Sequence, residues 1–128
     1  MNCEKQGSLL HLENSFVVMP KDANHYGNVH GGVMMLYIDN LAYTIASQFC
    51  RMNVVTARIS EMNFCKPVKT GDLVILTAEI IRVGKSSMDI KICVNGENLL
   101  TGSVFEVAQA MITMVAVDES GRPQAIKK

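Results

Sequence analysis

The chain has 128 residues, of which 48% are hydrophobic and 19% charged, so we expect one domain over residues 1–128 with too little length for a second. This apolar content excludes a disordered chain and predicts self-association. The 12 basic and 12 acidic side chains cancel, and with three Tyr, four Phe and no Trp the composition argues against nucleic-acid binding.

The cysteines and the N-terminal segment indicate a compartment. Four cysteines, at positions 3, 50, 65 and 93, are irregularly spaced and form no Cys-x-x-Cys pair, which argues against a zinc ribbon or a redox dithiol. We therefore expect mostly buried, reduced thiols in a cytoplasmic protein. Residues 1–16 contain charged side chains and no apolar block of signal-peptide length, so no secretion signal is expected.

A strand is predicted over residues 9–19, followed by a polar loop that ends at Gly32 and a helix over 33–52. The helix has nearly the length of a membrane span, but Asp39, Asn40 and Arg51 interrupt it. We therefore expect a buried helix in a soluble protein and no membrane insertion. Its apolar residues cover most of its circumference, so other elements must wrap around it.

Everything after the helix is predicted to form strands, over residues 54–64, 72–83, 87–95 and 99–117. Turns are expected at 69–72, at 83–86 and at Asn95-Gly96, and Pro67 should end the first of these strands. Apolar and polar residues alternate over 88–95 as in an antiparallel strand with one wet face. The polar segment 119–128 is expected to be a loose tail.

One long helix and four or more long strands predict an α+β domain in which an antiparallel sheet curls around the helix, the hotdog arrangement. Within it, the loop and the start of the helix have the composition of an active site. Glycines at positions 31 and 32 open the helix, where free backbone N–H groups can hold an oxyanion. Asp39 follows about two turns later and is costly to bury unpaired, so it is a candidate catalytic acid.

Each of these features also has a structural explanation. Asp39 could be a salt-bridge or capping partner, Asn24 a turn residue, and Gly31-Gly32 a tight turn into the helix. The turn Lys85-Ser86-Ser87 could bind phosphate or be an ordinary solvated loop.

Two other catalytic classes find little support. His25, His30 and Asp39 could suggest a metal site, but their spacing matches no helical ligand pair and no fourth ligand is evident, so no metal is expected. No Gly-x-Ser-x-Gly motif of a serine hydrolase occurs.

Several segments, in order along about four-fifths of the chain, resemble the hotdog-fold acyl-CoA thioesterases of the acyl-CoA hydrolase group, short bacterial single-domain type. The resemblance rests on Met19-Pro20-x-Asp22-x-Asn24-x-x-Gly27-x-x-x-Gly31-Gly32, Asp39, Val54-Val55-Thr56, Met62-Asn63-Phe64-x-Lys66-Pro67-Val68, Gly71-Asp72, 83–87 and 115–118. It implies hydrolysis of an acyl-CoA thioester to free acid and CoA, in fatty acid metabolism, without metal or cofactor.

The resemblance also implies roles for individual residues. Asp39 matches the helix carboxylate that acts as general base or nucleophile, and Asn24 matches the asparagine that places the water or the thioester carbonyl. Gly31 and Gly32 match the pair whose N–H groups form the oxyanion hole. Thr56 is expected to support the site by hydrogen bonding and His30 to contact the substrate. The expected CoA-binding residues are Asn63, Phe64, Lys66, Gly84, Lys85, Ser86 and Ser87, and those expected to contact the acyl chain are Met34, Met35 and Tyr37.

In that family the site is shared by two protomers, so a homodimer is the minimum and a trimer of dimers, a hexamer, is expected. The alternatives are an acyl-CoA-binding module without catalysis and a hotdog dehydratase, which needs an acid/base arrangement centred on histidine. The sequence does not indicate the length of the acyl chain.

Overall fold

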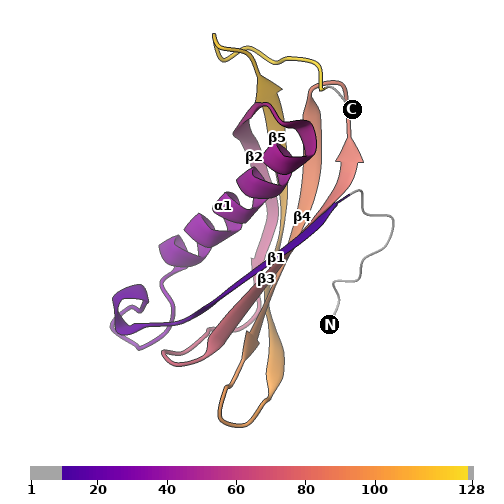
Figure 1. Ribbon diagram of the computed structural model, residues 1–128. Coiled ribbons are helices and arrows are strands. Elements are labelled where there is room, and N and C mark those ends of the chain that lie inside the picture. The colour runs from indigo at the N-terminus through magenta and orange to yellow at the C-terminus, as the bar shows by residue number, and fades with distance from the viewer. Residues whose placement is uncertain (1–9, 127–128) are drawn as a thin grey trace.

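A computed structural model describes residues 10–126. A five-stranded antiparallel sheet, in the order β1-β3-β4-β5-β2, carries the helix α1 along one face (Figure 1). The elements are β1 (His11–Val17), a short 3-10 helix η1 (Pro20–Asp22), α1 (Gly31–Cys50), β2 (Asn53–Phe64), β3 (Leu73–Val83), β4 (Ser87–Glu97) and β5 (Val104–Val117). The expected α+β hotdog architecture is confirmed.

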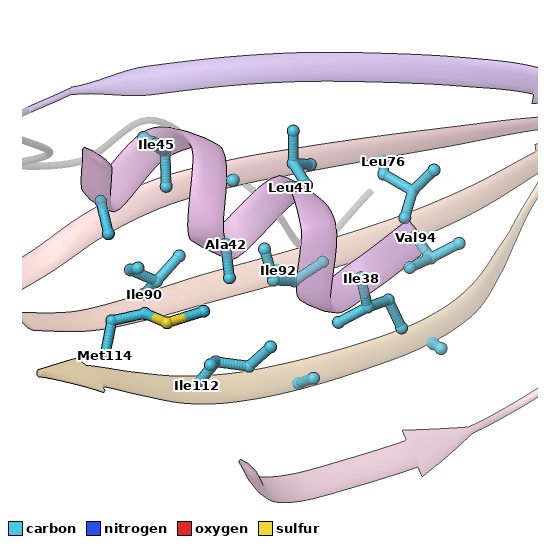
Figure 2. Close-up of a cluster of buried hydrophobic side chains, with 14 of the residues drawn as sticks. Ile38, Leu41, Ala42, Ile45, Leu76, Ile90, Ile92, Val94, Ile112 and Met114 are labelled. Carbon is cyan, nitrogen blue, oxygen red and sulfur yellow. The ribbon is translucent and has the colours of Figure 1, made fainter. Parts of the chain in front are cut away.

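The core lies between α1 and the concave face of the sheet. Ile38, Ala42 and Ile45 point from the helix toward side chains on β4 and β5, among them Ile90, Ile92, Ile112 and Met114 (Figure 2). These strand residues occupy alternate positions and therefore share one face. Burying each large apolar side chain stabilises the fold by about 1.5 to 3 kcal/mol. The opposite side of α1 stays open in the single chain, with Leu36 58% and Tyr43 49% exposed.

The expected turn at Asn95-Gly96 is wrong. Both residues lie inside β4, and a Cβ atom at Gly96 would sit 2.6 Å from ring atoms of Phe105. Glycine is needed there to accommodate the ring rather than to form a turn. The turn comes later, where Asn98 Oδ1 accepts hydrogen bonds from the N–H groups of Leu100 and Thr101, so β5 begins at Val104 and not at residue 99.

The segment after β5 is attached to the sheet. Gln124 N–H donates to the carbonyl of Ala116, and Ile126 N–H donates to the carbonyl of Lys85. The expectation of a loose tail is therefore wrong for residues 119–126, because backbone hydrogen bonds fix them; 127–128 lie outside the described residues.

The cysteines fulfil the expectation only in part. Cys50 is free and buried, and Cys65 is free and exposed. Cys93 is disulfide-bonded, so the expectation of a reduced thiol is wrong there, and Cys3 lies outside the described residues. Within residues 10–126, no helix is long and apolar enough to cross a membrane.

Candidate active site

Asp22 organises the loop between β1 and α1. Its Oδ2 accepts a hydrogen bond from Met19 N–H at 3.0 Å, its Oδ1 accepts one from Lys21 Nζ at 3.1 Å, and its carbonyl accepts one from His30 N–H at 2.8 Å. The Met19 N–H and the Lys21 ammonium hold the pKa of the Asp22 carboxyl below its usual value. Sequence reasoning assigned Asp22 no role of its own, although an acidic side chain at the third position of a helix can reach back to the backbone N–H of the N-cap residue, as in a capping box.

Asn24 uses its side-chain oxygen to shape the loop. Oδ1 accepts hydrogen bonds from Tyr26 N–H at 3.0 Å and Asn28 N–H at 3.2 Å, an Asx-type turn that Gly27 completes with a φ of +82°. The turn-forming role of Asn24 is thus present. With Oδ1 committed to the backbone, Nδ2 is the part of the amide that can donate to a ligand.

The helix begins two residues earlier than predicted because His30 caps it. His30 Nδ1 accepts a hydrogen bond from Gly32 N–H at 3.2 Å, and its carbonyl accepts from Val33 and Met34 at 3.0 and 3.1 Å. Histidine is not among the usual N-cap residues, so the sequence did not signal this role. Within residues 10–126, Gly31 N–H has no acceptor. Both Gly31 and Gly32 were expected to offer a free backbone N–H group. Among the described residues, the N–H of Gly31 is free, whereas the N–H of Gly32 is bonded to His30.

A cavity of about 280 Å³ lies beside Gly31. Its walls come from the helix start, from the segment after β2 and from β5, and the residues are Val29, Gly31, Met34, Phe64, Cys65, Lys66, Pro67 and Val107. The cavity brings together three groups expected from the sequence: the oxyanion donor Gly31, the CoA contacts Phe64 and Lys66, and the acyl contact Met34. The apolar wall residue Val107 and the thiol of Cys65 had no signal in the sequence.

Asp39 and Thr56 are direct partners. Thr56 Oγ1 donates to Asp39 Oδ1 at 2.7 Å, across 17 residues of sequence. Thr56 is exposed and Asp39 is only half-buried in the single chain. Because Oδ1 accepts the threonine hydroxyl, Oδ2 remains available to act on a ligand. Asp39 lies roughly 12 Å along the helix axis from Gly31, so the carboxylate and the free amide of one chain are well separated.

The expected CoA-binding residues form two groups in one chain. The turn after β3 is closed by a hydrogen bond from Gly84 N–H to the Ser87 carbonyl at 2.7 Å, and Ser87 pairs with Val115 of β5. Phe64, by contrast, pairs with Ala108, roughly 24 Å away along the strand. The two groups therefore lie at opposite ends of the sheet. The side-chain amide of Asn63 donates to the Glu61 carbonyl instead of reaching the cavity.

The three residues considered for a metal site do not converge. The ring of His25 lies against that of Tyr26, with centroids 4.1 Å apart, while His30 caps the helix and Asp39 binds Thr56. Across residues 10–126, no group of three or more His, Cys, Asp or Glu side chains could hold a metal ion.

Comparison with known proteins places the chain in a family. A sequence model of the thioesterase superfamily matches residues 26–102. The chain is 36% identical to a Bacillus subtilis protein that is named an uncharacterized acyl-CoA thioester hydrolase, over 87% of its own length and 64% of that protein. It is 30% identical to the mouse cytosolic acyl coenzyme A thioester hydrolase over 94% of its own length and 31% of that protein. The chain thus spans less than two thirds of these relatives.

Solved structures agree with this result. A hexameric acyl-CoA thioesterase superposes with a TM-score of 0.87 at 35% identity, covering 91% of this chain and 74% of that one. The Staphylococcus aureus acyl-CoA hydrolase, solved with butyryl coenzyme A and coenzyme A, gives a TM-score of 0.84 at 30% identity, covering 91% and 71%. Further structures of that hydrolase carry an alanine in place of one aspartate, one asparagine or one threonine. Since the family model matches more than half of its residues, the chain belongs to the thioesterase superfamily.

Proposed function

We propose that the protein is an acyl-CoA thioesterase that hydrolyses acyl-CoA to a free carboxylic acid and CoA. The observation that carries the proposal is the hydrogen bond of 2.7 Å that holds the Asp39 carboxylate against Thr56. The substituted asparagine, aspartate and threonine of the Staphylococcus enzyme have the same spacing along their chain as Asn24, Asp39 and Thr56 have here. This agreement supports these three residues as the catalytic set.

In the proposed reaction, water attacks the thioester carbonyl and Asp39 Oδ2 accepts the proton of that water. The carbonyl oxygen becomes an oxyanion, which backbone N–H groups at the start of α1 stabilise; each well-placed donor contributes roughly 3 to 4 kcal/mol. Asn24 Nδ2 donates to the water or to the carbonyl. The carbon–sulfur bond then breaks, and CoA leaves as the thiol after it takes up the proton.

A single chain cannot bring these groups to one carbonyl. The oxyanion needs donors at about 3 Å, whereas Asp39 and Gly31 of one protomer are separated by roughly 12 Å along the helix. The edge strand β2 offers a way to unite them. If β2 pairs antiparallel with β2 of a second copy, the Thr56 end of one strand lies beside the Phe64 end of the other. Asp39 and the turn 84–87 of one chain then face the cavity of its partner.

The assembly is proposed to be a homodimer at minimum and a trimer of dimers, and the hexameric state of a similar acyl-CoA thioesterase supports a hexamer. We propose the cytoplasm as its compartment, supported by the name of the mouse relative. The proposed chemistry uses only side chains and backbone amides, without metal or cofactor. Acyl-CoA esters are its proposed substrates, which links the enzyme to fatty acid metabolism.

The first test is thiol release from acyl-CoA esters of short to long chains by the wild type and by Asp39→Ala. Chemistry at Asp39 predicts a loss of activity by orders of magnitude while CoA binding, measured by calorimetry, is retained. If the wild type binds acyl-CoA and releases no thiol, the protein is a binding module and the enzyme proposal is wrong.

A second test addresses the shared site. Asp39→Ala and Gly31→Val, each of which is expected to be inactive alone, are coexpressed with different affinity tags. If each site takes Asp39 from one chain and Gly31 from its partner, half of the dimers are mixed and each contains one intact site, so about a quarter of wild-type activity returns. If both residues act within one chain, no activity returns. A stable, active monomer in analytical ultracentrifugation would also contradict the shared site.

A further inference from the structure

The imidazole of His30 occupies a backbone donor that the proposed reaction needs. Its Nδ1 accepts the Gly32 N–H at 3.2 Å, and the side chain is exposed. The backbone of His30 is fixed on both sides, because its N–H donates to the Asp22 carbonyl and its own carbonyl accepts from Val33 and Met34. The ring can therefore leave the Gly32 amide by side-chain rotation, without any change at the start of the helix.

The same ring fills the space in front of Gly32. For a Cβ atom built at Gly32, the nearest atoms of residues 10–126, apart from its chain neighbours and the helix backbone, are His30 Nδ1 at 3.6 Å and Cε1 at 4.0 Å. At Gly31, by contrast, no other atom of the described part of the chain lies within 4 Å of such a Cβ atom, chain neighbours and helix backbone apart, and this glycine lines the cavity. A ligand oxygen can thus approach the Gly31 amide directly, whereas it meets the imidazole at the Gly32 amide.

An N–H group forms one well-aligned hydrogen bond at a time, so the imidazole and an oxyanion exclude each other at Gly32. We propose that His30 is a positioning residue that competes with the substrate oxyanion for the Gly32 amide. The second donor of the oxyanion site becomes available only when the ring swings away. This inference rests on the proposed thioesterase function. It adds that the His30 ring lowers the rate of thioester hydrolysis, because the ring must first leave the Gly32 amide.

Removal of the competing acceptor should raise activity while it weakens the helix start. In His30→Ala, no ring has to be displaced before the oxyanion can bind the Gly32 amide. We therefore expect kcat/KM to rise by about three- to tenfold, which is the factor that corresponds to breaking one exposed hydrogen bond. The gain should appear in kcat, because the oxyanion exists only in the transition state and the intermediate. Loss of the N-cap should lower Tm at the same time.

Two further variants separate competition from other roles. His30→Asn supplies a side-chain oxygen that can again accept the Gly32 N–H and cap the helix, so relative to His30→Ala it should restore Tm and reverse the gain in kcat. His25→Ala removes a nearby exposed histidine that bonds to neither glycine, and should leave both quantities unchanged. If His30 acts only as a helix cap, its replacement in His30→Ala should lower Tm without raising kcat.

The assay measures kcat and KM for thiol release from a short acyl-CoA, together with Tm, at one protein concentration. An unchanged or reduced kcat in His30→Ala overturns the inference, and a raised KM would indicate that His30 instead contacts the substrate. If no variant and no wild-type sample releases thiol, the proposed function itself fails, and the inference fails with it. That outcome differs from an active wild type whose His30→Ala variant shows no gain.

Discussion

Replacing Gly31 with alanine should make the protein more stable and less active. Gly31 is the first residue of α1, and its φ is not in the left-handed region. A Cβ atom there would meet nothing within 4 Å, so no contact within the described chain requires a glycine. Alanine is favoured over glycine in helices by about 0.5 to 1 kcal/mol. Since the effect is smaller in the first turn, we expect a gain of about 0.5 kcal/mol in the free energy of unfolding.

The same methyl group would project where the cavity adjoins the Gly31 amide. A thioester carbonyl must approach that amide nitrogen to about 3 Å, and displacement by a methyl group weakens or removes the hydrogen bond. We expect kcat/KM to fall by about 10- to 100-fold, which corresponds to about 1.4 to 2.7 kcal/mol of lost transition-state stabilisation. The loss should appear mainly in kcat.

The assay pairs thiol-release kinetics with urea unfolding at one protein concentration, because the stability of an oligomer depends on concentration. Gln48→Ala, at an exposed position on the same helix, is the matched control and should leave activity unchanged. A Gly31→Ala variant that gains stability and keeps full activity would show that the oxyanion is not held at this amide. A destabilised variant would show that the partner chain packs against Gly31.

Three further predictions test other parts of the structure. Thr56→Val removes the hydroxyl that donates to Asp39 Oδ1, so kcat for thiol release should fall by about tenfold or more. Thr56→Ser, which keeps a hydroxyl, should have a kcat near that of the wild type. An unchanged kcat in Thr56→Val would refute the role of this hydrogen bond. Glu61 has a φ of +54°, which glycine adopts without strain. Glu61→Gly should therefore raise the free energy of unfolding, measured by urea titration, by about 1 kcal/mol. Glu61→Ala keeps the strained backbone and should show no such gain. Burial raises the pKa of the Asp89 carboxyl, but hydrogen bonds from Arg82 and Thr113 outweigh it and leave the pKa below the ordinary 3.8. The stabilisation from Asp89 is therefore complete above pH 3.8 and is lost as the pH falls through the lower pKa of the folded state. In Asp89→Asn, the free energy of unfolding should decrease less steeply with falling pH in this acid range. If the wild type and the variant lose stability equally in acid, Asp89 does not make this contribution.

The fold followed from the sequence wherever hydrophobic periodicity was regular. Alternation over residues 88–95 predicted most of β4, and the run from Val54 to Phe64 predicted β2 to within one residue. The Asn-Gly pair at 95–96 failed as a signal, because a tertiary contact required the glycine: the ring of Phe105 packs where a side chain would lie. A dipeptide signal carries no information about such a partner across the sheet.

Parts of the candidate site were predictable and parts were not. The resemblance placed Thr56 as a hydrogen-bonding support, and the structure brings it to Asp39. The separation of Phe64 from the turn 84–87 could not be seen, because it depends on the register of β2 and β4 against β5. The cap at His30 was also missed, because a histidine at this position has no distinctive pattern.

The two edges of the sheet differ in a way that connects stability to the proposed catalysis. β1 has 7 residues, and Glu13, Asn14 and Ser15 at its centre are exposed and polar. β2 has 12 residues, and Val55 is 48% exposed beside the exposed Thr56 and Ala57. Although β2 also exposes Arg58 and Glu61, its length and its exposed apolar side chains favour pairing with another strand, whereas the short polar edge of β1 discourages it. Pairing through β2 would cover this edge and bring Asp39 to the partner's Gly31, so dilution of the protein should reduce activity and stability over the same concentration range.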